Sequence, residues 1–194
     1  MSPRNLMLPT ILLALYASAA FANPTTYMCD PAHTYPSFSA DHFGGLSVWR
    51  GKFTKSTCTI VMDRQANTGN VTVTVDTSSV DFGMPALNAG AQTAELFDVT
   101  KYPTATYTGR LADFKKGSPT KVIGQLTLHG VTQPLTLTIR HFECKEVAMF
   151  HQYRCGADAS GEFDRAKYGM DYGKTMGFQM WVRLHIQVEG VRQG

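Results

Sequence analysis

The chain is 194 residues long and carries a formal net charge of +3 at pH 7. Its 18 lysines and arginines are scattered along the sequence, which argues against a nucleic-acid-binding surface and against a polybasic membrane patch. The length suits one domain with a hydrophobic core of its own. Net charge therefore gives little information about the partner of this protein.

Residues 1–22 have the pattern of a cleaved secretory signal peptide. Arg4 supplies a positive charge, Leu6–Phe21 is almost wholly apolar, and Ala20-Phe21-Ala22 is a small-x-small cleavage site. A membrane anchor is the alternative, but a spanning helix needs about 20 consecutive apolar residues and this run is too short. We therefore predict an exported protein consisting of residues 23–194.

The stretch Tyr27–Phe53 is expected to contain two strands joined by a plug at one end of a barrel. A first extended piece over Tyr27–Asp30 is interrupted by Pro31, because proline fixes its own φ angle and restricts the residue before it. A turn or a single helical turn is predicted over Pro36–His42, ended by two glycines. A second strand is predicted to begin near Ser47.

Alternation of apolar and polar residues dominates the rest of the chain and predicts β-strands. The longest example is Phe178–Val188. The other predicted strands are Val48–Val61, Val71–Val75, Thr104–Leu111, Val122–Leu128, Leu135–Ile139 and Ala157–Phe163. Together with the first short piece they make about eight strands, each with one apolar and one polar face. The predicted fold is all-β, a single closed antiparallel β-barrel.

One segment, Pro85–Phe97, is rich in Ala, Leu, Gln and Glu and predicts a short helix across one end of the barrel. An eight-stranded barrel is either filled by its own side chains or wide enough for one small ligand. Gly109 and Gly124 fall on predicted strands, where glycine marks a bend or a close approach by another group. The spacing of these residues leaves a filled and a hollow barrel equally open.

Four cysteines lie behind the signal peptide, and an even number in an exported protein favours disulfides. Three pairings are possible. Cys144 and Cys155 flank a predicted hairpin tip, so we favour a bond between them, with Cys29 and Cys58 joining the first two strands. The cysteines do not have the Cys-x-x-Cys spacing of a metal site.

The sequence contains no recognisable catalytic motif. A Gly-x-Ser-x-Gly nucleophile motif is absent and no carboxylate pair stands out. The one cluster of candidate metal or haem ligands is Asp30, His33, Asp41 and His42, and a metal site needs three or four converging groups. We therefore predict neither an enzyme nor a metal site. Aromatic residues and methionines, among them Met170 and Met176, are suited to line a deformable apolar site.

Four motifs, in order along residues 23–194, resemble those of the YceI-like family. They are Asp30-Pro31-Ala32-His33-Thr34 with Phe38, His42 and Gly51-Lys52-Phe53; Phe97-Asp98-Val99 with Lys101-Tyr102-Pro103-Thr104; Gly124-Gln125-Leu126-Thr127-Leu128 with Gly130-Val131-Thr132-Gln133-Pro134-Leu135; and Ala159-Ser160-Gly161-Glu162-Phe163-Asp164-Arg165 with Tyr168-Gly169-Met170.

This resemblance implies a lipocalin-like barrel in the periplasm that encloses a long apolar lipid, such as a polyisoprenoid or an isoprenoid quinone, without catalysing a reaction. The role it implies is carriage, storage or quinone supply near the inner membrane, with no cofactor apart from the bound lipid. It also favours a hollow barrel. The residues expected to contact the ligand are Phe38, His42, Phe43, Val73, Phe97, Tyr102, Tyr107, Leu126, Leu137, Met180 and Leu184, with His42 as the polar contact.

The chain departs from the family pattern over Ala86–Ala94, which is apolar where members usually carry charged residues. Two alternatives stay open. Some members lie beside or are joined to b-type cytochromes, so one alternative is an accessory redox or enzymatic partner using Asp30, His33 and His42. The other is a structural stress-response protein with a filled barrel. A homodimer would help to cover a strand edge or the barrel mouth.

Overall fold

The computed structural model describes residues 23–194, so the predicted signal peptide lies outside the described residues. The strands are β1 Thr25–Cys29, β2 Tyr35–His42, β3 Ser47–Phe53, β4 Ser56–Asp63, β5 Thr68–Asp76, β6 Val80–Asp81, β7 Thr104–Ala112, β8 Lys121–Leu128, β9 Val131–Val147, β10 Gln152–Asp164 and β11 Trp181–Arg192. The helices are α1 Pro85–Ala91 and the 3-10 turns η1 Thr77–Ser79, η2 Ala148–Phe150, η3 Arg165–Tyr168 and η4 Lys174–Met176. No helix within residues 23–194 has the length and hydrophobicity that a membrane span needs.

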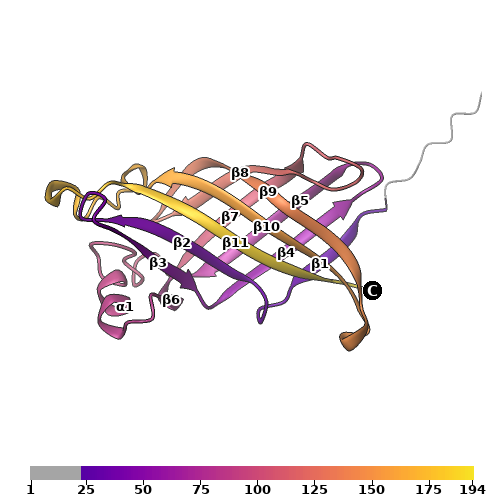
Figure 1. Cartoon of the computed structure of the whole chain (residues 1–194), viewed down its shortest axis with the longest axis horizontal. Helices are drawn as coiled ribbons and strands as arrows, with labels where there is room; N and C mark the ends of the chain where they lie inside the picture. Colours follow the sequence, from indigo (N-terminus) through magenta and orange to yellow (C-terminus); the bar gives the residue numbers. More distant parts are fainter. Residues whose placement is uncertain (1–22) are drawn as a thin grey trace, which may run out of the picture.

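Eight of these strands close into an antiparallel barrel in the order β1-β4-β5-β7-β8-β9-β10-β11, and β11 pairs back with β1 (Figure 1). The two ends of β11 have different partners: Gly190 lies opposite Cys29 of β1, whereas Val182 lies opposite Ala40 of β2. At the second end β2, β3 and β6 continue the sheet outward from β11. The predicted lipocalin-like closed barrel is confirmed.

The barrel is packed at one end and hollow at the other. The packed end is a cluster of buried side chains from six strands. Its members are Tyr27, Met62, Tyr107, Leu111, Val122, Leu135, Leu137 and Cys155. Three of them, Tyr107, Leu135 and Leu137, also line a cavity that occupies the rest of the interior, so they form its floor. The alternative of a filled barrel is therefore wrong for the half of the barrel beyond this floor.

The two strand glycines are explained by a close approach rather than by a bend. Gly109 and Gly124 lie opposite each other on β7 and β8. A Cβ added at Gly124 would lie 2.8 Å from Cζ of Tyr107, and one added at Gly109 would lie 2.8 Å from Cγ1 of Val122. Gly124 leaves room for the Tyr107 ring, whose hydroxyl donates to the carbonyl of Leu135 at 3.0 Å, and Gly109 leaves room for the Val122 side chain.

The structure pairs the cysteines as predicted, Cys29 with Cys58 and Cys144 with Cys155. Cys144 and Cys155 are directly opposite in the β9–β10 hairpin, and the other bond joins β1 to its neighbour β4. Cys155 belongs to the packed cluster and Cys144 packs against it, so the hairpin disulfide reinforces the half of the barrel that is already filled.

Two predictions about the first part of the chain are wrong. Residues 36–42 form most of β2, hydrogen-bonded between β11 and β3, instead of a turn. Val48–Val61 is two strands, because β3 pairs with β2 whereas β4 pairs with β1, and the chain changes partner at Thr54 and Lys55. A break of this kind depends on contacts that are remote in sequence, and the local alternation continues across it.

The predicted helix over Pro85–Phe97 is also too long, since α1 ends at Ala91. Its C-terminal part contains Gly90, which is a poor helix former. Beyond it the backbone turns, with the N–H of Phe97 donating to the carbonyl of Ala91 at 3.0 Å. This turn directs the Phe97 side chain into the barrel.

Candidate functional site: an apolar cavity at one end of the barrel

The hollow half of the barrel contains a cavity of about 550 Å³. This volume lies within the range of roughly 300–1,000 Å³ that is usual for sites that bind small molecules. Its wall consists mainly of aliphatic and aromatic side chains from the inner faces of the strands, together with α1 and the segments after α1 and η3. Nine of the eleven residues predicted from the sequence line it. They are Phe38, His42, Phe43, Val73, Phe97, Tyr107, Leu126, Leu137 and Leu184.

The other two predicted residues lie elsewhere. Met180 precedes β11, outside the cavity wall, and its carbonyl accepts a hydrogen bond from the Arg165 N–H at 2.8 Å. The ring of Tyr102 packs 4.5 Å from the ring of His129, beside the β8–β9 turn. Met180 continues the alternation of Val182 and Leu184, but the chain before β11 has already left the barrel, so the alternation no longer indicates the interior there. Tyr102 precedes β7 and is out of phase with its inward residues Ala105 and Tyr107.

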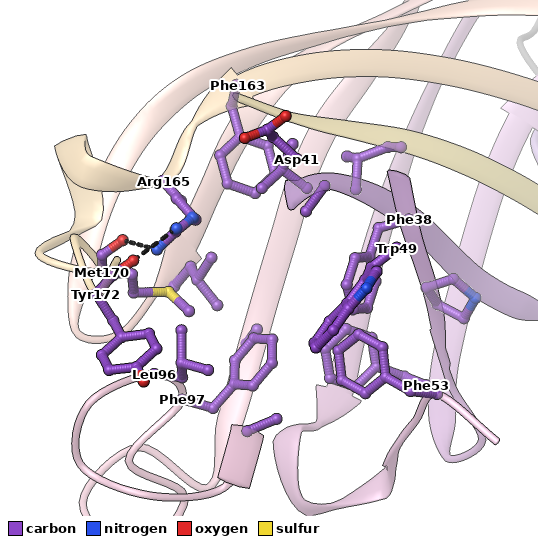
Figure 2. Close-up of a pocket in the computed structure, with 18 of the residues that line it drawn as sticks. Phe38, Asp41, Trp49, Phe53, Leu96, Phe97, Phe163, Arg165, Met170 and Tyr172 are labelled. Carbon is purple, nitrogen blue, oxygen red and sulfur yellow. Dashed lines mark hydrogen bonds between the residues drawn. The ribbon is translucent and has the colours of Figure 1, made fainter. Parts of the chain in front are cut away.

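Four phenylalanines form one wall of the cavity (Figure 2). The ring of Phe38 on β2 is 5.6 Å from that of Phe53 and 5.6 Å from that of Phe82, and Phe53 is 5.4 Å from Phe97. Tilted and edge-to-face pairs of this kind are favoured by the quadrupoles of the rings. Phe53 and Phe82 were not among the predicted site residues, because their aromatic character alone does not distinguish an ordinary core from a ligand site.

Two buried charges interrupt the apolar wall near the mouth of the cavity. Asp41 is 5% exposed and Arg165 is 8% exposed. Arg165 donates to the carbonyls of Met170 at 2.6 Å and of Tyr172 at 2.7 Å (Figure 2). Burial lowers the pKa of the Arg165 guanidinium from its ordinary value, while the negative charges of nearby aspartates, Asp41 among them, oppose this shift.

Asp41 joins the β2–β3 turn to the segment that enters β11. Its Oδ2 accepts hydrogen bonds from the backbone N–H groups of Gly44 and Gln179, both at 2.9 Å. These bonds, that from Gln179 above all, hold the pKa of Asp41 below its usual value. Its Oδ1 is buried and has no hydrogen-bond partner among the described residues. Neither Asp41 nor Arg165 was predicted to line a lipid cavity. Asp41 was considered only as a candidate metal or haem ligand, and Arg165 only as the end of a stretch in the fourth family motif.

The candidate ligands His33 and His42 lie at opposite ends of β2. His33 lies before β2, where its Nδ1 is 2.9 Å from Oδ2 of Asp30. His42 lies at the far end of β2, where its ring stacks on Trp49 at 4.0 Å and packs against Phe43 at 4.3 Å. Within residues 23–194 no three His, Cys, Asp or Glu side chains converge in a way that could hold a metal ion.

A closed antiparallel barrel with an apolar cavity opening at one end defines a lipocalin-like protein with a small-molecule site. A family model for the YceI-like domain matches residues 27–190. The chain belongs to this family, as the four motifs predicted. Protein YceI of Salmonella arizonae is 31% identical over 168 residues, which cover 83% of each chain.

Two solved structures share the fold at low sequence identity. BcnA of Burkholderia cenocepacia matches with a TM-score of 0.64 at 19% identity, over 83% of this chain and 98% of that chain. A polyisoprenoid binding domain from Saccharophagus degradans, described as implicated in plant cell wall breakdown, matches with a TM-score of 0.58 at 16% identity, over 86% and 98% of the two chains.

Proposed function

We propose that this protein is an exported, non-catalytic carrier that holds one long apolar lipid, a polyisoprenoid or an isoprenoid quinone, in the barrel cavity. The observation that carries the proposal is the apolar cavity of about 550 Å³ between the floor formed by Tyr107 and the mouth beside Phe43. The polyisoprenoid-binding domain with the same fold supports this class of ligand. Carriage or storage in the periplasm is the role that suits an exported protein of this kind.

The energetics suit a long chain with a small polar end. Each buried methylene contributes about 0.8 kcal/mol, so a dozen contribute roughly 10 kcal/mol. Association costs of at least about 4 kcal/mol reduce this gain but leave useful affinity without a strong polar anchor. The ligand is selected mainly by the length and shape of its tail. The charges of Asp41 and Arg165, and the ring of His42, place the polar end near the mouth.

The direct test is organic extraction of the purified protein followed by mass spectrometry. We expect a long-chain lipid in close to stoichiometric amount. Repeated recovery of no apolar molecule, together with no binding of cis-parinaric acid, a fluorescent long-chain probe, would overturn the proposal.

A matched pair of variants connects the binding to the cavity. Ala40 on β2 lines the cavity, so Ala40→Trp fills part of it and is expected to weaken cis-parinaric acid binding by roughly tenfold or more, since several methylene contacts are lost. Ala148 lies exposed on the β9–β10 hairpin at the opposite end, so Ala148→Trp makes the same chemical change away from the cavity. Equal binding by the two variants would place the ligand elsewhere.

A further inference from the structure

The cavity opens between two loops whose apolar side chains face solvent. Phe43 in the β2–β3 turn, Tyr172 before η4 and Met176 within η4 line the cavity and are also exposed. The two loops touch, since a Cβ added at Gly44 would lie 2.9 Å from the carbonyl oxygen of Gly177. The opening therefore lies beside the contact of these loops, at the end of the barrel where α1 also lies (Figure 1).

Two further exposed apolar side chains lie at this end of the barrel without lining the cavity. Leu46, at the tip of the β2–β3 turn, is 78% exposed, and Met84, which precedes α1, is 57% exposed. A chain of aromatic contacts joins these segments: Phe43 is 4.8 Å from Phe178, and Trp49 is 6.4 Å from Phe82. We call Phe43, Leu46, Trp49, Met84, Tyr172 and Met176 the apolar rim.

The segments that carry most of the rim contain no charged residue. Residues 43–49, 82–94 and 175–182 are free of Asp, Glu, Lys and Arg. The hairpin at the opposite end of the barrel is also tipped by an exposed methionine, Met149, but residues 143–154 include four charged residues. An apolar patch assembled from loop tips at one end of a molecule marks an interaction surface.

We propose that the apolar rim inserts into the surface of a lipid bilayer, so that the ligand passes between membrane and cavity without crossing water. This proposal rests on the proposed function. The bilayer is the partner whose chemistry fits, because it accepts uncharged apolar tips and itself contains the water-insoluble ligand. A second copy of the chain, or a protein partner, bound over the rim would cover the cavity opening.

Insertion rather than electrostatic adsorption provides the binding energy. The exposed charges beside the rim have both signs, with Arg50 and Lys174 offset by Glu95 and Asp171. A surface of this kind gains little from anionic lipid, and its binding is expected to depend weakly on salt. Apolar side chains that reach the acyl boundary bind in proportion to the area they bury.

The experiment is flotation of the purified protein with phosphatidylcholine vesicles, at low and at high salt. Leu46→Glu and Met84→Glu are expected to reduce the bound fraction by roughly tenfold or more, because a carboxylate must leave water. Met149→Glu is the matched control, since Met149 is 82% exposed at the opposite end, and it is expected to bind as the wild type does. In a Trp181→Phe background, the emission of Trp49 is expected to shift to shorter wavelength when vesicles are added.

Three outcomes would overturn the proposal. In the first, the wild-type protein does not float with neutral or anionic vesicles. In the second, the Met149→Glu variant binds vesicles as weakly as the Leu46→Glu variant. In the third, sedimentation velocity shows that the wild type is a dimer through the rim and that Leu46→Glu separates it into monomers. Binding of cis-parinaric acid in solution is measured on the same variants. Leu46 and Met84 do not line the cavity, so if only this inference is wrong, both variants and the wild type still bind the probe. If the proposed function is wrong, the wild-type protein itself does not bind the probe.

Discussion

The ring of Tyr107 on β7 occupies the space in front of Gly124 on β8. A Cβ at position 124 would clash with the carbonyl oxygen of Thr108 and would also lie 2.8 Å from Cζ of this ring. Burial raises the pKa of Tyr107 to about 12, so the phenol stays protonated and donates to the carbonyls of Leu135 and Val122. A neutral, hydrogen-bonded aromatic ring thus closes the floor of the cavity.

Replacement of Gly124 should therefore be costly. Gly124→Ala is expected to lower the free energy of unfolding by about 1–3 kcal/mol, as overpacking of a core does. Urea unfolding monitored by circular dichroism measures the effect. Gly90 is the control, because a Cβ there meets nothing within 4 Å and the residue lies in α1. Gly90→Ala should be neutral or stabilising by about 0.4–1 kcal/mol, and equal losses in both variants would contradict the account of Tyr107.

Asp41 is predicted to act through the oxygen that accepts two backbone hydrogen bonds. Asp41→Ala leaves the N–H groups of Gly44 and Gln179 without their acceptor and should cost about 2 kcal/mol. Asp41→Asn retains an acceptor oxygen in the same place and should cost less than about 1 kcal/mol. Urea unfolding at neutral pH compares the two variants. An equal loss in the two variants would show that the charge of Asp41, which both remove, stabilises the cavity mouth rather than its hydrogen bonds.

Asp30 makes the stability of the packed end dependent on pH. Hydrogen bonds from His33 and, to a lesser extent, from Arg154 lower its pKa from 3.8, and its Oδ2 lies 2.8 Å from Nη1 of the buried Arg154. Folding thus favours the ionised carboxylate. This contribution is present above about pH 4 and is lost as the pH falls through the lower pKa of the folded state.

Asp30→Asn should therefore cost about 3 kcal/mol at pH 7, because it leaves Arg154 buried beside a weaker partner, Glu189 at 3.3 Å. The difference from the wild type should shrink below about pH 4. Glu162→Gln breaks the exposed ion pair with Arg183 and should cost no more than about 1 kcal/mol at any pH. Urea unfolding at a series of pH values tests both, and a difference that grew in acid would refute the assignment.

The two disulfides should contribute unequally. Cys29 and Cys58 are 29 residues apart, and Cys144 and Cys155 are 11 apart. In the chain-entropy model the longer loop gives the larger stabilisation, about 3–4 kcal/mol against about 3 kcal/mol. Calorimetry of the Cys29→Ala/Cys58→Ala and Cys144→Ala/Cys155→Ala variants should show the larger fall in Tm for the first pair. The reverse order would mean that the hairpin disulfide also stabilises the native state directly, in addition to lowering the entropy of the unfolded chain.

The barrel was predictable because apolar and polar residues alternate strictly along its strands. This alternation identifies the side chains that face the interior even when the neighbouring strands are not known. Val73, Leu126, Leu137 and Leu184 were found at the cavity in this way. The boundaries that failed depend on distant contacts. Pro36 lacks a backbone donor and suggested a turn, yet it lies near the start of β2 between two hydrogen-bonded neighbours.

The two charged residues at the mouth were harder to predict because the groups that hold them in place lie in loops. Arg165 is placed by the carbonyls of Met170 and Tyr172, and Asp41 by two backbone N–H groups, all of which come from irregular backbone. No periodicity connects such positions to the interior. The apolar content of residues 82–94 was visible in the sequence, but only the structure shows that this segment lies at the same end of the barrel as the β2–β3 turn (Figure 1).

The packed end of the barrel also sets a maximum depth for anything that enters. A guest that reaches Tyr107 can go no further, so a tail longer than the cavity must fold back on itself or protrude between Phe43 and Met176. The ligand then enters and leaves through the same opening, so a second ligand molecule cannot bind until the first has dissociated.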